Sequence, residues 1–314
     1  MKQGKSNTRI AGVDVGKAWL DVAVHGMEGA ARTANTADGF SELIGWLKAR
    51  EVGRVGLEAT GGYERGVRAA LEAAGLEVVV HQPLEVRLFA RLKRMKAKSD
   101  RLDAVLIAAA TAQVDAVKAA QDPRLTTLAE RLTAYEQITD KAAELKAFLE
   151  HVTLADVAAD IQQQIRALAN LKAKLARAVL AEIKAHADLA MRLKLLLSLP
   201  GVGPIVAAGL VVRMPELGSM SRGQAASLLG VAPFDRDSGQ SKGMRLISGG
   251  RTRPRRLVYL AALAARRCDA NLKAFAGRLR DRGKPPKVVL VAVMRKLIEA
   301  ANLVLRRQTP WQTA

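Results

Sequence analysis

The sequence predicts an α/β domain with a mixed sheet, followed by a longer part built mainly from helices. Short apolar, β-branched runs alternate with helix-spaced segments over residues 8–120. Residues 124–190 contain no glycine or proline, and helices return after a glycine-rich turn near residue 200. Alternating β and α segments are typical of α/β domains, and long segments without helix breakers are typical of extended helices.

The N-terminal segments follow the order β-β-α-β-α-β-α. The predicted strands are residues 10–15, 19–24, 52–58 and 76–81, and the predicted helices are residues 38–50, 61–74 and 99–120. Gly75 suits the position after a helix end, and Ser99 suits an N-cap. Asp122-Pro123 then breaks the chain.

Residues 123–190 predict a long helical hairpin. One helix is expected over about 125–150 and a second over about 154–189, with Thr153 as the N-cap of the second. An apolar stripe at Leu168, Leu171 and Leu175 is typical of an antiparallel hairpin or coiled coil. Such a hairpin serves either as a spacer or as a surface for dimerisation or RNA binding.

Turn residues and helix caps mark several helix boundaries in the C-terminal third. The run Leu199-Pro-Gly-Val-Gly-Pro204 has the form of a helix-hairpin-helix turn. Gly201 and Gly203 allow a tight turn that presents N–H groups to a phosphate, although a plain turn between helices has the same form. Further helices are predicted at residues 221–229, with Ser221 as the cap, and at residues 254–265 and 288–306.

Four acidic residues of the N-terminal part stand out. Asp14 lies in a predicted strand, Glu58 ends another, and Asp100 and Asp103 lie three apart at the start of a predicted helix. A carboxylate in an apolar strand is costly to bury unless it is paired or binds a metal. The i, i+3 pair shares one helix face, so the four acids are expected to converge on one hard cation or two.

The charge balance points to a polyanion. The chain has 50 Lys+Arg against 30 Asp+Glu, a net charge of +20, and residues 242–307 hold eighteen basic and three acidic residues. Nucleic acid is the usual partner of such a chain, a merely basic protein being the alternative. The candidate nucleic-acid-binding residues are Gly201, Gly203, Lys242, Arg245, Arg251, Arg253, Arg255 and Arg256.

Other features narrow the class of protein. The single cysteine, Cys268, excludes an internal disulfide and a cysteine-rich zinc site. The chain opens without a signal-peptide pattern and has no apolar run of the roughly 18 residues that a membrane span needs. We therefore expect a cytoplasmic protein without a membrane partner.

A polar, glycine-rich and basic segment covers residues 230–251. Ser238 precedes Gly239 there, and an exposed hydroxyl among cations suits a nucleophile that attacks a phosphodiester. A solvated loop that only contacts phosphate is the alternative. Ser241 is a second candidate nucleophile.

In order and spacing these segments resemble the DEDD-type transposases of the bridge-RNA-guided insertion sequences, which are related to Piv-type site-specific DNA invertases. The motifs that carry the resemblance are Gly12-Val-Asp-Val-Gly-Lys17, Glu58-Ala-Thr-Gly-Gly-Tyr63, Phe89-Ala-Arg91, Ala97-Lys-Ser-Asp-Arg-Leu-Asp-Ala104, Leu199-Pro-Gly-Val-Gly-Pro204, Leu229-Gly-Val-Ala-Pro233 and Ser238-Gly239.

The resemblance implies three domains: a RuvC-like domain of RNase-H type at 1–122, a coiled-coil hairpin at 123–190, and a C-terminal serine transposase domain at 191–314. It implies that Asp14, Glu58, Asp100 and Asp103 hold Mg²⁺ (or Mn²⁺) and that Ser238 attacks DNA. A noncoding bridge RNA would pair with donor and target DNA, and a homodimer would assemble into a nucleoid-associated tetramer.

Two other functions compete with an RNA-guided transposase or recombinase. A RuvC-like nuclease that hydrolyses junctions would need the four acids and not Ser238. A non-catalytic nucleic-acid-binding protein would need the basic region and not the acids, which would repel DNA without a metal.

Overall fold

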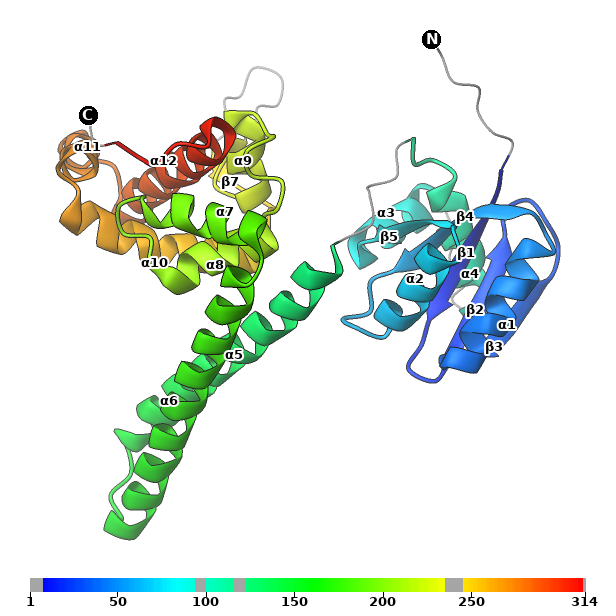
Figure 1. Ribbon diagram of the computed structural model, residues 1–314, viewed down its shortest axis with the longest axis horizontal. Coiled ribbons are helices and arrows are strands. Elements are labelled where there is room, and N and C mark those ends of the chain that lie inside the picture. The colour runs from blue at the N-terminus through cyan, green and yellow to red at the C-terminus, as the bar shows by residue number, and fades with distance from the viewer. Residues whose placement is uncertain (1–7, 94–99, 116–121, 235–244, 313–314) are drawn as a thin grey trace. The chain divides into compact units, whose positions relative to one another are not determined.

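A computed structural model describes residues 8–93, 100–115, 122–234 and 245–312 (Figure 1). The side chains of residues 100–102 are outside this description, and so are Ser99, Ser238, Ser241 and Lys242. The chain divides into two compact units, residues 1–120 and residues 121–314. The three-domain division at 122 and 190 stays a prediction.

The N-terminal unit is built on a five-stranded mixed sheet of order β3-β2-β1-β4-β5. Its strands are β1 (Arg9–Val15), β2 (Trp19–Val24), β3 (Ala30–Ala34), β4 (Val52–Glu58) and β5 (Glu77–His81). β2 is antiparallel to β1 and to β3, whereas β1, β4 and β5 are parallel. This order and these directions are those of the RNase-H-type fold of RuvC-like domains, as expected.

Helices cover both faces of this sheet. They are α1 (Ala37–Lys48), α2 (Glu64–Ala73), α3 (Pro83–Leu92) and α4 (Asp100–Thr111). Side chains of a strand alternate between its two faces. Val13 and Val15 pack in one core with Leu43 and Leu47 of α1 and Leu71 of α2. The other face of β1 lies against α4.

The predicted order of strands and helices lacks two elements of this unit, β3 and α3. β3 has the sequence Ala-Ala-Arg-Thr-Ala and almost no hydrophobic alternation, so its pairing with β2 defines it. α3 begins at Pro83, shortly after the predicted strand 76–81, and proline is favoured at a first helical position. In addition, α4 ends at Thr111 and not near residue 120.

In its described residues, 122–234 and 245–312, the C-terminal unit is helical apart from one small two-stranded sheet. Its elements are α5 (Pro123–Leu149), α6 (Ala155–Lys184), α7 (Ala187–Leu197), α8 (Pro204–Arg213), α9 (Arg222–Leu229), β6 (Pro233–Phe234), β7 (Leu246–Ile247), α10 (Thr252–Cys268), α11 (Ala270–Asp281) and α12 (Pro286–Arg307). α5 and α6 pack along each other as a long hairpin (Figure 1).

One core joins the base of this hairpin to the other helices. Leu128 and Leu132 of α5 and Ile183 of α6 are fully buried in the same cluster as residues of α8, α10 and α12. Burying a leucine or isoleucine side chain contributes about 1.5–3 kcal/mol, so the base of the hairpin is held firmly.

Several predicted boundaries in this unit were wrong. The predicted second helix, residues 154–189, stops at Lys184, and α7 starts after His186. Leu154, not Thr153, is the N-cap of α6. α11 was missed, although Asp269 caps it by accepting a hydrogen bond from the Leu272 N–H at 2.8 Å. The predicted cap at Ser221 is confirmed, with Gln224 completing a capping box.

No helix in the described part of the chain is long and apolar enough to cross a membrane.

Candidate active site and nucleic-acid contacts

Asp14 and Glu58 lie on neighbouring strands and on the same face of the sheet. Val13 of β1 is in register with Leu57 of β4, so the next residue of each strand is again side by side. Both carboxylate residues are partly buried at the carboxyl ends of their strands. Strand register alone therefore brings together two acids that are 44 positions apart in sequence.

α4 lies on this face. A Cβ at Gly12 would overlap the backbone of Ala104 and Ala108, and a Cβ at Gly56 would overlap the hydroxyl of Thr111. Gly12 and Gly56 thus let α4 approach the backbone of β1 and β4. Because Asp14 and Glu58 follow these glycines by two residues, they share the face that α4 covers.

The third acid, Asp103, is one residue from the contact between α4 and β1. It is partly buried, and its neighbour Ala104 is fully buried against the sheet. Asp100 is the first residue of α4, one helical turn before Asp103, and its side chain is outside the described residues. The backbone therefore places the predicted i, i+3 pair at the start of the helix that covers Asp14.

A polar row that was not predicted crosses the sheet through these acids. Asp21 of β2 is directly opposite Asp14, and Arg32 of β3 is directly opposite Asp21. The Arg32 guanidinium donates to both Asp21 oxygens, at 2.9 and 2.8 Å, and the Asp21 side chain is only 9% exposed. The signal was present, because Asp21 is also a carboxylate in an apolar strand.

His81 ends the row on β5, opposite Glu58. Its Nε2 lies 2.8 Å from the Thr111 hydroxyl, which itself donates to the Ile107 carbonyl. The hydroxyl must then accept from His81, so Nε2 carries the proton. Burial lowers the pKa of His81, against the opposing effect of Glu85, and keeps the ring neutral near pH 7.

Two further polar residues shape the loops that follow the acids. The Asn35 amide donates to the Gly16 carbonyl at 2.8 Å and to the Tyr63 carbonyl at 3.2 Å, which ties the loop after Asp14 to the loop after Glu58. The sequence gave no long-range signal for this bridge, since Asn35 reads only as a turn residue.

Glu64 holds the loop after Glu58 from within. One of its oxygens accepts from the Thr60 hydroxyl at 2.7 Å and from the N–H groups of Gly62 and Thr60 at 2.8 and 3.2 Å. Burial works against the charged form, yet these hydrogen bonds outweigh it and hold the pKa of Glu64 below its usual value. These hydrogen bonds therefore stabilise the conformation of the loop that follows Glu58.

The donor set of the candidate site consists of carboxylates, which hard cations such as Mg²⁺ prefer. Within the described part of the chain, no three Asp, Glu, His or Cys side chains come together as a metal-binding group. That part lacks the Asp100 side chain. Asp14, Glu58 and Asp103 belong to the described part, so these three carboxylates alone do not form such a group there. Their oxygen atoms suit the ion chemically, and strand register places Asp14 and Glu58 side by side.

The predicted nucleophile, Ser238, and its alternative, Ser241, lie outside the described residues, as does Lys242. The residues on either side of this segment are joined in β6 and β7, where Phe234 pairs with Leu246. Arg245 is exposed next to β7.

The two glycines of the predicted helix-hairpin-helix turn differ in their surroundings. Gly201 has a φ of +72°, and a Cβ there would overlap the backbone of Ala261 and Ala265 in α10. Its glycine identity thus follows from left-handed backbone and close helix packing. Gly203 is the N-cap of α8 and has open space beside it. Phosphate binding by either glycine stays a prediction.

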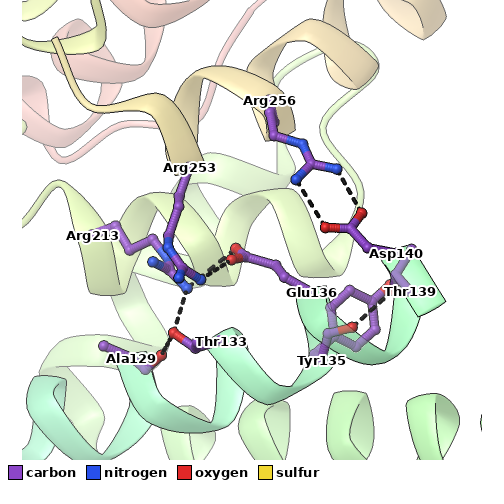
Figure 2. A network of polar contacts seen from close by, with 9 residues as sticks. All are labelled: Ala129, Thr133, Tyr135, Glu136, Thr139, Asp140, Arg213, Arg253 and Arg256. Atoms are coloured by element: carbon purple, nitrogen blue, oxygen red, sulfur yellow. Dashed lines mark hydrogen bonds and ion pairs between the residues drawn. The ribbon is translucent and has the colours of Figure 1, made fainter. Parts of the chain in front are cut away.

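Two of the arginines predicted to bind nucleic acid join α10 to the hairpin. Figure 2 shows Arg253 and Arg213 converging on Glu136 of α5, and Arg256 paired with Asp140. The N–O distances are 2.5 Å for Arg253, 3.2 Å for Arg213 and 2.7 Å for Arg256. Glu136 and Arg213 are mostly buried, with side chains 15% and 11% exposed. Burial lowers the pKa of the Arg213 guanidinium, and Glu136 opposes this shift.

Arg251 and Arg255 also have partners within the protein. Arg251 donates to both carboxylate oxygens of Glu216, at 2.6 and 2.8 Å, and to the Arg213 carbonyl at 2.7 Å. Arg255 donates to the Gly249 carbonyl at 2.8 Å. These side chains stabilise the unit, and their contact with nucleic acid stays a prediction.

Comparison with known proteins identifies the family. Residues 11–155 match a transposase model for the DEDD-type proteins of insertion sequence IS110, and residues 193–277 match the model "Transposase IS116/IS110/IS902 family". The chain belongs to the IS110 family of DEDD-type transposases. It is therefore a DNA transposase or recombinase, as the motifs predicted.

The chain is also similar to individual proteins. The pilin gene-inverting protein of Moraxella lacunata is 25% identical over 316 residues, which cover 96% of both chains. An uncharacterized 43.6 kDa protein of insertion element IS110 from Streptomyces coelicolor is 31% identical over 139 residues, 44% of this chain and 34% of that protein. RuvC of T. thermophilus in complex with a Holliday junction substrate aligns with 34% of this chain and 93% of its own, at 16% identity and a TM-score of 0.28.

Proposed function

We propose that this IS110-family transposase exchanges DNA strands with a Mg²⁺-binding acidic tetrad and a serine nucleophile, under the guidance of a noncoding RNA. The observation that carries the proposal is the position of Asp14 and Glu58. They lie side by side at the carboxyl end of the sheet, beneath the helix that begins with Asp100 and Asp103.

Asp14, Glu58, Asp100 and Asp103 would hold Mg²⁺, or Mn²⁺, which when bound neutralises charge on a scissile phosphate. The protein's own residues prepare that position. Arg32 neutralises Asp21 next to Asp14, which limits repulsion within the polar row. Gly12 and Gly56 allow α4 to pack close to the sheet, so the helix that begins with Asp100 and contains Asp103 stays on the face that carries Asp14 and Glu58.

Ser238 would supply the attacking oxygen. Its Oγ forms a bond to phosphorus as the bond from phosphorus to the departing deoxyribose oxygen breaks. A general base, for which a tetrad carboxylate is the candidate, takes the serine proton, and the departing oxygen gains a proton. The phosphoserine linkage conserves the phosphodiester energy, so reversal onto another DNA end rejoins the strands.

Partners follow from the family resemblance and from the charge. A bridge RNA pairing with donor and target DNA would supply sequence recognition, and the basic surface would hold both polyanions. A homodimer assembling into a tetramer would bring two DNA ends together, with the helical hairpin as a candidate contact between protomers. Recovery of the protein with bound nucleic acid, followed by RNA sequencing, tests this part.

The nucleophile is tested by trapping on a nicked suicide substrate, with denaturing gels and peptide mapping. Wild type should form a covalent protein–DNA adduct, Ser238→Ala should bind DNA normally and form none, and Ser241→Ala should retain the adduct. An adduct that persists in Ser238→Ala and disappears in Ser241→Ala would move the nucleophile to Ser241. An active wild type that forms no adduct would instead support a metal-dependent nuclease.

A further inference from the structure

A cleft of about 650 Å³ opens in the C-terminal unit, and none of the residues assigned above to the chemistry is among its lining residues. It lies between α11, α12 and the Leu199-Pro200 turn, and Trp311 near the C-terminus contributes to its lining. A volume of this size is in the range of small-ligand sites. The cleft therefore has room for a ligand larger than a metal ion or a phosphate.

One part of the lining is apolar and aromatic. Leu272 and Phe275 of α11, Leu303 of α12 and Trp311 all line the cleft and are partly buried. Trp311 is held in place by its backbone N–H, which donates to the Ser198 hydroxyl at 2.8 Å. Aromatic side chains fixed in this way provide surfaces on which a planar ring can stack.

The remaining lining is strongly basic. Four cations contribute to it, Arg222, Arg278, Lys296 and Arg306, against two acids, Asp269 and Glu299. Both acids already have partners. Glu299 pairs with Arg222 at 2.6 Å and with Arg295 at 2.9 Å, and Asp269 accepts from the Leu272 N–H.

Two of the cations are left for a ligand. Among the described residues, no carboxylate lies within ion-pairing distance of Arg278 or Lys296. Lys296 Nζ lies 4.5 Å from the centre of the Phe275 ring, so a cation and an aromatic face are next to each other. A ligand that carries both an anionic group and a flat apolar ring matches this pair.

We propose that this cleft binds an unpaired nucleotide of a nucleic acid that the protein carries or acts on. The base stacks against Phe275, and the phosphate binds Arg278 and Lys296. Stacking on aromatic side chains beside cations is the general mode of single-strand recognition. A fully paired duplex keeps its base faces covered, so the cleft selects single-stranded, looped or flipped nucleotides. The inference rests on the family's action on nucleic acid and is independent of the nucleophile.

The test compares Phe275→Leu with Phe148→Leu in the full-length protein. Leucine keeps an apolar side chain on α11 and removes the aromatic face, and Phe148 is an exposed phenylalanine at the end of α5. Binding of labelled single-stranded DNA, single-stranded RNA and duplex DNA is measured by fluorescence anisotropy. We expect Phe275→Leu to weaken single-strand binding on the order of tenfold and duplex binding little, with Phe148→Leu unchanged.

A second measurement reports direct contact. Oligonucleotides with a 4-thiothymidine or 4-thiouridine base should cross-link to peptides containing Phe275 or Trp311, and Arg278→Gln/Lys296→Gln should reduce that yield. The DNA and RNA arms show which polymer supplies the nucleotide.

Equal single-strand affinities of the two leucine variants would overturn the proposal. So would equal losses on single strands and duplex, or cross-links that map elsewhere. If wild type binds neither polymer, the nucleic-acid function fails together with the cleft.

Discussion

The two units of this transposase place their charged residues by different means. In the N-terminal unit, Asp14 and Glu58 come together because the register of adjacent strands fixes them on one face. In the C-terminal unit, Arg253 and Arg256 lie on a helix surface and pair with acids more than a hundred positions away. A charge at a strand end is positioned by backbone pairing, whereas a charge on a helix is positioned by whatever packs beside it. We therefore expect that removing the charge of Asp14 costs catalysis, whereas removing the charge of Glu136 costs stability.

The largest expected effect is on the reaction. Asp14→Asn should reduce recombination on the order of a thousandfold or more, since a bound cation contributes several kcal/mol of transition-state stabilisation. The far-UV circular dichroism and the unfolding temperature without metal should match those of wild type. Stabilisation by added Mg²⁺, read as a thermal shift, should be lost.

Glu28→Gln is the matched control, because Glu28 is an exposed acid of the same unit. It should recombine at the wild-type rate and keep the Mg²⁺ shift. If Asp14→Asn recombines at the wild-type rate, Asp14 does not belong to the proposed metal site. The two units would then not differ in the way described above.

The second effect is on stability. Glu136→Gln should lower the free energy of unfolding by about 3 kcal/mol, because it leaves the mostly buried Arg213 without its carboxylate. Asp140→Asn breaks the pair with Arg256, whose side chain is 64% exposed, and should cost at most about 1 kcal/mol. Urea unfolding measures both. A similar loss of stability in the two variants would show that burial does not make the Glu136–Arg213 pair more important to stability than the exposed Asp140–Arg256 pair of Figure 2.

The sequence predicted more of the first unit than of the second, for a physical reason. Strand alternation fixes a face, so Asp14 and Glu58 were predictable as a pair once their strands were recognised. The same argument would have found Asp21, which lies opposite Asp14 in the β1–β2 pair. It would not have found the partner Arg32, because β3 has no hydrophobic pattern.

Helix surfaces carry no comparable constraint. A run of arginines such as Arg251–Arg256 reads as a phosphate-binding patch, because composition shows the charge and not its partner. Glu136, Asp140 and Glu216 supply those partners from distant helices and turns. The boundary between α6 and α7 at Ala185–His186 was also not predicted, because no glycine or proline marks the end of α6.

The third effect separates paired from unpaired cations. Arg280 and Lys284 are exposed, and among the described residues no carboxylate pairs with either. Arg280→Gln/Lys284→Gln should reduce the slope of log affinity against log salt by about 0.9 for each lost phosphate contact on duplex DNA. Arg253 is already paired with Glu136, so Arg253→Gln should lower stability and reduce the slope less than the double variant does.

Salt dependence is better tested by substitution than by deleting the basic region 242–307. The deletion would also remove Val258, Val293 and Leu297 from the hydrophobic core. A lower salt slope for Arg253→Gln, with no change for Arg280→Gln/Lys284→Gln, would reverse the assignment of the two sets of cations.

The smallest effect is a pH dependence of the N-terminal unit. The pKa of Glu64 is lowered in the folded protein, because hydrogen bonds from Thr60 and Gly62 favour its charged form over the opposing effect of burial. A depressed carboxylate pKa stabilises the fold above the unfolded value of 4.5, and this stabilisation is lost as the pH falls through the folded pKa. Glu64→Gln should therefore cost about 1 kcal/mol at pH 7, and the difference from wild type should shrink steadily below about pH 4.5. Chemical unfolding followed between pH 7 and acid, with Glu28→Gln as the control, measures it. A difference that stays constant across that range would mean that the loop after Glu58 is held by the shape of the side chain and not by its charge.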